Sequence, residues 1–202
     1  FSSVAHTGFI LVGVTSTSAR SLSAVLVYLF AYGLTTLGAF GVVSLVRSPS
    51  GEATHISQWA GIGRKSPVAA GTFALFLLAL AGIPLTSGFT AKFAVFTAAY
   101  DGGASKLVVV AVVASAIAAF FYGRLIVLMF FTPATDKTAD VVVPSALSLA
   151  GIGIAAAFTR TNVCVRRRLR SWMARASSSL PVPVSPSSST VASVGATDDE
   201  TT

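Results

Sequence analysis

The chain has 202 residues, of which 53% are hydrophobic and only 10% are charged, and its mean hydropathy is +0.79. A soluble domain carries about 25% charged residues, so this composition excludes an ordinary soluble globular protein. The net charge is +7, but the few charges lie between long apolar runs, which favours a membrane protein with a basic segment over a nucleic-acid-binding protein. Cys164 is the single cysteine, so the chain can form neither an internal disulfide nor a thiolate metal site.

The apolar runs predict an all-α polytopic membrane protein with about five transmembrane helices. A helix needs about 20 residues to cross a bilayer. The first residue is Phe1, inside an apolar run, so we expect a truncated first helix and a C-terminal fragment of a longer protein. The predicted membrane segments are residues 1–14, 22–46, 67–100, 106–131 and 141–159.

The third segment is too long for one straight crossing. As a continuous helix, residues 67–100 would measure about 51 Å, against about 30 Å for the hydrocarbon core. A break near 82–88 resolves this, because Pro84 cannot donate to the helical ladder and Gly82 and Gly88 allow non-helical backbone. Freed backbone groups at membrane depth need protein or a water-filled cavity around them, so the break indicates a polar pathway.

Lys92 is the principal candidate for proton transfer on that pathway. It lies four residues after Gly88, and a lysine at mid-membrane costs roughly 2.5 to 3.5 kcal/mol unless it faces a partner or water. A lysine that extends to the headgroups is the alternative, but the adjacent break favours the pathway role.

His6 is the second candidate, since imidazole can relay protons through either nitrogen. A neutral histidine bonded to a nearby carbonyl is the simpler explanation on spacing alone. Arg124, in the fourth segment, is explained by reach to the headgroups or by an interhelical ion pair. No pattern typical of a soluble catalyst is present, so we predict no catalytic residues, no metal site and no cofactor bound by this chain.

Five stretches resemble, in order and spacing, the antiporter-like membrane subunits of proton-pumping NADH:quinone oxidoreductase, respiratory complex I. The match covers about residues 1–158, and Lys92 favours subunit N over the sister subunit M, which usually has glutamate there. Leu85 and Ala91 depart from the family pattern LAGIPPTAGFIGKF, which has proline and glycine at these positions. The stretches are FSSVAHTGFI (1–10), YLFAYGLTTLGAF (28–40), AGIGRKSP (60–67), LAGIPLTSGFTAKF (80–93) and ASAIAAFFYGR (114–124).

The resemblance implies the last five helices of a fourteen-helix subunit that conducts protons along a hydrated mid-membrane axis. It implies a role for Lys92 in the outlet half-channel and places His6 on or near the same axis. Quinone reduction elsewhere in the complex would drive the protons, and NADH, FMN, iron–sulfur clusters and quinone would belong to partner subunits. The implied partners are other membrane subunits of complex I and the lipid bilayer, in the bacterial inner or plasma membrane.

Two alternatives stay open at this point. The first is a subunit of a multisubunit cation/proton antiporter of the Mrp type, which is homologous and also has a lysine in a broken helix. The second is a structural membrane scaffold in which Lys92 only reaches the headgroups.

Residues 160–202 differ in kind from the rest. Six arginines fall within 16 positions, a Ser- and Pro-rich stretch follows, and this composition predicts disorder. Four loop cations against two place the loops after the second and fourth segments in the cytoplasm by the positive-inside rule, and the tail would reverse that count to eight against four. We therefore hypothesise that the tail comes from a shifted reading frame or a divergent gene model. A genuine basic tail that binds anionic lipid is the alternative.

Overall fold

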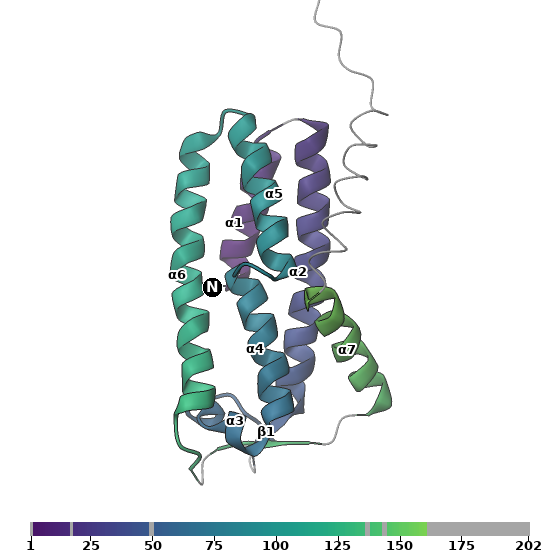
Figure 1. Ribbon diagram of the computed structural model, residues 1–202, viewed down its shortest axis with the longest axis vertical. Coiled ribbons are helices and arrows are strands. Elements are labelled where there is room, and N and C mark those ends of the chain that lie inside the picture. Colours follow the sequence, from purple (N-terminus) through teal and green to yellow (C-terminus); the bar gives the residue numbers. More distant parts are fainter. Residues whose placement is uncertain (1, 17, 49–50, 136–137, 143–144, 161–202) are drawn as a thin grey trace, which may run out of the picture.

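The computed structural model describes residues 2–16, 18–48, 51–135, 138–142 and 145–160. Phe1 lies outside the described residues, and so does the predicted tail, residues 160–202, except for Arg160, which ends the last helix. The described part is a bundle of α-helices with a 3₁₀ helix, η1 (Ile56–Trp59), in a connection (Figure 1). The helices are α1 (Ser2–Val14), α2 (Ala19–Leu45), α3 (Ile62–Lys65), α4 (Pro67–Ala81), α5 (Ser87–Asp101), α6 (Ser105–Phe131) and α7 (Ala146–Arg160).

Two long helices run the height of the bundle, and two half-length helices lie end to end beside them (Figure 1). α2 and α6 have 27 residues each, and each is long and apolar enough to cross a bilayer. α4 and α5 have 15 residues each and replace the predicted third segment. α1 packs beside α5, and α7 packs on α2 and α4.

Local signals explain where these helices begin. The Ser18 side chain accepts a hydrogen bond from the Ser21 backbone N–H at 3.1 Å and caps α2. Pro67 stands in the first turn of α4, where its missing N–H has no intrahelical partner to lose. α2 and α6 begin and end within three residues of the segments 22–46 and 106–131.

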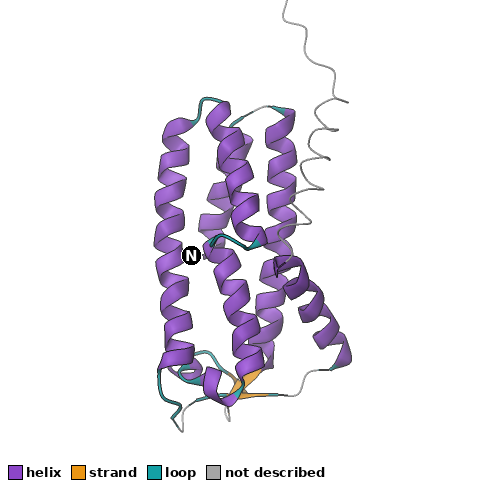
Figure 2. Ribbon diagram, viewed as in Figure 1, coloured by secondary structure: helices purple, strands orange, loops and turns teal. Residues whose placement is uncertain are grey.

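A small antiparallel sheet at one end of the bundle was not predicted (Figure 2). Its strands are β1 (Val46–Ser48), β2 (Gly51–Glu52) and β3 (Asp140–Val141), in the order β2-β1-β3. Val46 pairs with Val141, so the start of the segment predicted as helix over 141–159 is a strand, and α7 begins at Ala146. Backbone N–H and C=O groups of β3 bond to β1, so residues 140–141 do not need the hydrogen bonds of a helix.

The buried apolar residues form two clusters, one in each half of the bundle. One cluster includes Phe73, Phe76 and Met129, and α4 contributes to it. The other includes Phe9 and Val95, and α5 contributes to it. The gap between α4 and α5 therefore lies where the two clusters meet, at mid-height of the bundle (Figure 2).

Candidate functional site

The break begins where α4 ends at a left-handed glycine. Gly82 has φ +79°, a conformation that glycine adopts without steric cost. Its N–H donates to the Leu78 and Ala79 carbonyls, and the Ile83 N–H also donates to Leu78 O at 3.1 Å. These bonds terminate the helix and satisfy part of its carbonyl end.

α5 then starts at a threonine cap. The Thr86 hydroxyl accepts from the Phe89 backbone N–H at 3.5 Å and donates to the Ile83 carbonyl at 2.8 Å. A Cβ at Gly88 would overlap the Ala79 carbonyl oxygen, so the first turn of α5 packs directly against the last turn of α4. This close contact brings Lys92, one turn later, to the end of α4.

The break creates the acceptors that hold the lysine. In an uninterrupted helix, Leu80 O would accept from residue 84, but Pro84 has no N–H. Instead the Lys92 Nζ donates to Leu80 O at 2.8 Å and to Ala81 O at 3.3 Å. The carbonyls that the break frees are thus satisfied by an ammonium from the following helix.

Two further contacts complete the surroundings of Lys92, which is 5% exposed. Its Nζ donates to the Ser115 hydroxyl on α6 at 3.2 Å and lies 5.0 Å from the centre of the Phe9 ring. A Cβ at Gly82 would lie 3.0 Å from Lys92 Cδ and 3.2 Å from Nζ, so glycine there leaves room for the lysine. The side chain therefore points into the bundle and away from its ends.

His6 lies on the other side of the same space. It is 2% exposed, and its Nδ1 shares a hydrogen bond of 2.6 Å with the Tyr28 hydroxyl. The ring of Tyr32, one turn further along α2, stacks on the imidazole at 4.5 Å between centres. Among the described residues, His6 Nε2 is buried without a hydrogen-bond partner.

His6 and Lys92 line one small cavity of about 10 Å³. That volume has room for about one water molecule. Tyr28, Tyr32 and Thr35 also line it, together with apolar residues of α2 and α4. The structure thus brings both predicted pathway residues to one small cavity.

Tyr28, Tyr32 and Ser115 are the neighbours that the sequence did not single out. Tyr28 and Tyr32 are four residues apart, a spacing that places both on one face of α2. Ser115 is an isolated hydroxyl within the apolar α6. Each pattern is a usable signal, but the contact of Ser115 with Lys92 depends on how α5 and α6 pack.

Comparison with known proteins shows which family the chain belongs to. Residues 1–118 match the family model described as NADH:quinone oxidoreductase/Mrp antiporter, TM. The chain belongs to this family. The predicted resemblance to antiporter-like membrane subunits is therefore confirmed, and this antiporter-like chain is a multi-pass protein of the bacterial cell membrane.

Individual relatives of the antiporter-like chain are named subunit N. It is 58% identical over 159 residues to NADH-quinone oxidoreductase subunit N 3 of Streptomyces griseus, covering 79% of this chain and 29% of the relative. It is 50% identical over 163 residues to subunit N of Mycobacterium bovis, covering 79% and 31%. The chain spans about three tenths of the length of these relatives.

A solved structure agrees with the fold. The antiporter-like chain matches a chain of respiratory complex I from Thermus thermophilus with bound aureothin, with a TM-score of 0.68 and 27% identity. The match covers 82% of this chain and 37% of that chain.

Proposed function

We propose that the chain forms the Lys92-containing part of a proton-translocating subunit N in a bacterial NADH:quinone oxidoreductase. The observation that carries the proposal is the buried Lys92 ammonium, held at a helix break and sharing a water-sized cavity with His6. NADH oxidation and quinone reduction take place in partner subunits, which hold FMN and the iron–sulfur clusters.

The three hydrogen-bond acceptors around Lys92 allow its side chain to be held in both the protonated and the neutral state. A lysine ammonium has three donors, and here they reach Leu80 O, Ala81 O and Ser115 Oγ. A neutral amine has two hydrogens and a lone pair. The carbonyls can only accept, whereas the Ser115 hydroxyl can rotate and donate to that lone pair. Ser115 is therefore compatible with both protonation states and marks the α6 side as one end of the transfer route.

The other end of the route is the cavity shared with His6. His6, Tyr28 and Lys92 all line that cavity, and among the described residues His6 Nε2 is buried without a hydrogen-bond partner. We propose that protons reach Lys92 from this side and leave toward Ser115 when the charges around the lysine change. The path is lateral, because it joins α1, α2, α5 and α6 at mid-height.

We further propose that the described helices make five membrane crossings, equivalent to the last five of fourteen. α4 and α5 together form one discontinuous crossing, and α1, α2, α6 and α7 form the others. The end-to-end stacking of α4 and α5 beside the 27-residue α6 supports this arrangement (Figure 1).

The two alternatives are less well supported. A structural scaffold needs Lys92 to reach the headgroups, but the side chain is 5% exposed and bonded to Leu80 and Ser115 inside the bundle. The family model includes Mrp antiporters, but relatives 50–58% identical to the chain are named subunit N. These observations favour the oxidoreductase.

Lys92→Ala in the complex that contains this chain tests the proposal. We expect inverted membrane vesicles to translocate fewer protons per NADH oxidised, because the buried carrier is lost, with a smaller effect on NADH oxidation by an artificial acceptor. Lys106→Ala is the matched control, since Lys106 is an exposed lysine in the first turn of α6. An unchanged proton-to-electron ratio in Lys92→Ala contradicts the proposal, and a strict requirement for Na⁺ supports the antiporter instead.

A further inference from the structure

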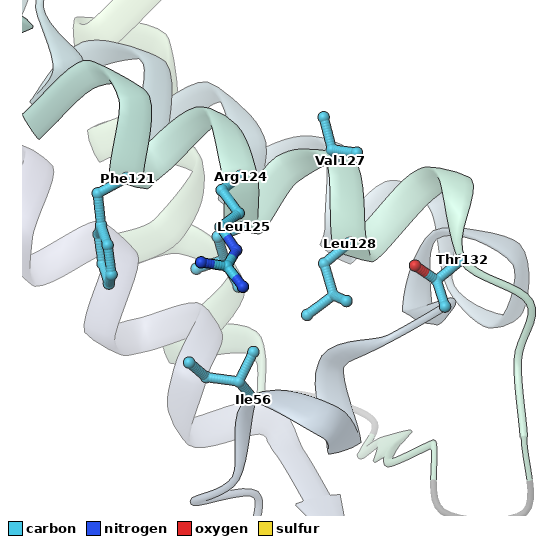
Figure 3. Close-up of a pocket in the computed structure, with 7 residues that line it drawn as sticks. All are labelled: Ile56, Phe121, Arg124, Leu125, Val127, Leu128 and Thr132. Carbon is cyan, nitrogen blue, oxygen red and sulfur yellow. The ribbon is translucent and has the colours of Figure 1, made fainter. Parts of the chain in front are cut away.

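A groove beside the lower half of α6 is separate from the Lys92 site. It has a volume of about 420 Å³ and a mostly apolar wall, with Arg124 as the single charged residue among those that line it. Phe121, Arg124 and Leu128 lie at helical spacing on one face of α6, and their side chains point toward Ile56 of η1 (Figure 3). Thr132 closes the end of the groove nearest the end of α6.

Arg124 has no carboxylate partner within the described residues. The acidic residues in that part of the chain are Glu52, Asp101 and Asp140, and each is in an ion pair with another cation. The interhelical ion pair considered for Arg124 on sequence grounds is therefore not formed there. A cation on a membrane helix requires an opposite charge or water, and no carboxylate of the described residues meets the Arg124 guanidinium.

The level of the guanidinium in the bilayer follows from Ile56. Ile56 lies across the groove from Arg124 (Figure 3) and is 61% exposed. It follows the irregular residues Thr54 and His55, which are also exposed. Exposed irregular backbone does not occur in the hydrocarbon region of a bilayer. Arg124 therefore stands at headgroup level, where its charge faces lipid phosphates.

The apolar part of the groove continues away from that level. Phe121 lines the deeper end, Phe120 directly before it is 76% exposed, and Ile117, one turn closer to the start of α6, is 67% exposed. An occupant that meets Arg124 with an anion thus meets an apolar helix face beyond it. Arg47, Arg64 and Lys65 cluster at the same end of the bundle, the pattern of a cytoplasmic face, where anionic lipids gather.

We propose that this groove binds an anionic phospholipid, with the phosphate on Arg124 and an acyl chain along Phe121 toward Ile117. A single guanidinium that binds phosphate through two N–H groups suits a phosphodiester, and the apolar wall suits a chain of methylenes. The headgroup then lies on the Thr132 side of the groove.

The test titrates the detergent-purified complex that contains the chain with phosphatidylglycerol or phosphatidylcholine, and native mass spectrometry counts bound lipids. We expect the unmodified complex to retain one more phosphatidylglycerol than phosphatidylcholine. Arg124→Gln should weaken that binding about tenfold, as loss of a charge-assisted hydrogen bond predicts. Arg64→Gln is the matched control, because Arg64 is exposed at the same end but outside the groove.

Phe121→Ser tests the apolar wall with the charge intact, and it carries the test if Arg124→Gln does not assemble. It should also weaken phosphatidylglycerol binding. Equal losses in Arg124→Gln and Arg64→Gln would overturn the proposal, because they indicate general surface attraction. So would inorganic phosphate that competes as well as the lipid, or loss of a protein subunit from Arg124→Gln with an unchanged lipid count.

Discussion

Leu85 combines an unusual backbone conformation with a departure from the family pattern. Among the described residues it is the one non-glycine residue with positive φ, at +82°, and its side chain is 86% exposed. The left-handed region costs a leucine about 1–2 kcal/mol. Proline, which the family pattern has at this position, has φ fixed near −65° and cannot adopt it. The backbone at the break therefore differs from the one that a proline at this position would allow. The Leu80 and Ala81 carbonyls still accept hydrogen bonds from Lys92.

Substitutions at Leu85 should separate backbone strain from side-chain loss. Leu85→Gly should raise the free energy of unfolding by about 1 kcal/mol, because glycine adopts this φ freely. Leu85→Pro should lower it. Leu37→Gly is the control, since Leu37 is an exposed leucine in the middle of α2, where glycine should cost about 1 kcal/mol. Thermal unfolding in detergent, monitored by circular dichroism, measures all three variants. A loss of stability in Leu85→Gly would contradict the prediction that the backbone at Leu85 is strained.

At the scale of elements, the close approach of α4 and α5 is what converts two helix ends into a binding site. Gly88 permits the contact, Gly82 turns the chain, and Lys92 then reaches the carbonyls of α4. The ammonium also stands at the carboxyl end of a helix, where partial negative charge accumulates. The geometry of the site is therefore a property of the α4–α5 junction and not of either helix alone.

Gly88→Ala should separate the two helices. The added Cβ overlaps the Ala79 carbonyl oxygen, so α5 must shift, at a cost of about 1–3 kcal/mol in stability. Gly71→Ala, in α4, meets nothing within 4 Å and should instead gain up to about 1 kcal/mol from helix propensity. Unfolding of both variants in detergent measures the difference, and equal stability would show that the junction tolerates a side chain at Gly88.

Much of the helical pattern could be predicted, because long apolar runs and proline positions are local signals. The small sheet could not, since β1 to β3 have only two or three residues each and β3 lies far from β1 in sequence. For the site, Lys92 and His6 stand out as polar residues in apolar segments. Ser115 does not, because its contact with Lys92 arises only from the packing of α6 on α5.

At the scale of the whole molecule, the connections at one end of the bundle are tied to each other. Lys65 donates to the Thr138 carbonyl at 3.0 Å and pairs with Asp140, and the Thr138 hydroxyl donates to Ala60 O at 2.9 Å. Gly61 sits within this junction, and a Cβ there would lie 2.5 Å from the Ala134 backbone nitrogen. The connection before α4 and the one after α6 thus form one structural unit.

Gly61→Ala should destabilise the whole bundle through this junction. Gly61 has φ +73°, and Gly103 has φ +85° with nothing within 4 Å, so Gly103→Ala measures the conformational cost alone, about 1–2 kcal/mol. We expect Gly61→Ala to cost a further 1–3 kcal/mol, roughly, because it also displaces backbone. The midpoints of thermal unfolding give the comparison, and equal losses would argue against a rigid junction.

The division of one crossing into α4 and α5 also constrains how the protein enters the membrane. Each half has 15 residues, or about 22 Å of helix, which is short of the roughly 30 Å hydrocarbon core. During synthesis, a nascent chain that ends at Ala81 cannot yet span the bilayer, and stable integration must await the residues of α5. The lysine therefore enters the membrane together with the segment that completes the crossing. Two of its three acceptors, Leu80 O and Ala81 O, belong to residues that precede it in synthesis, and the third, Ser115, follows with α6.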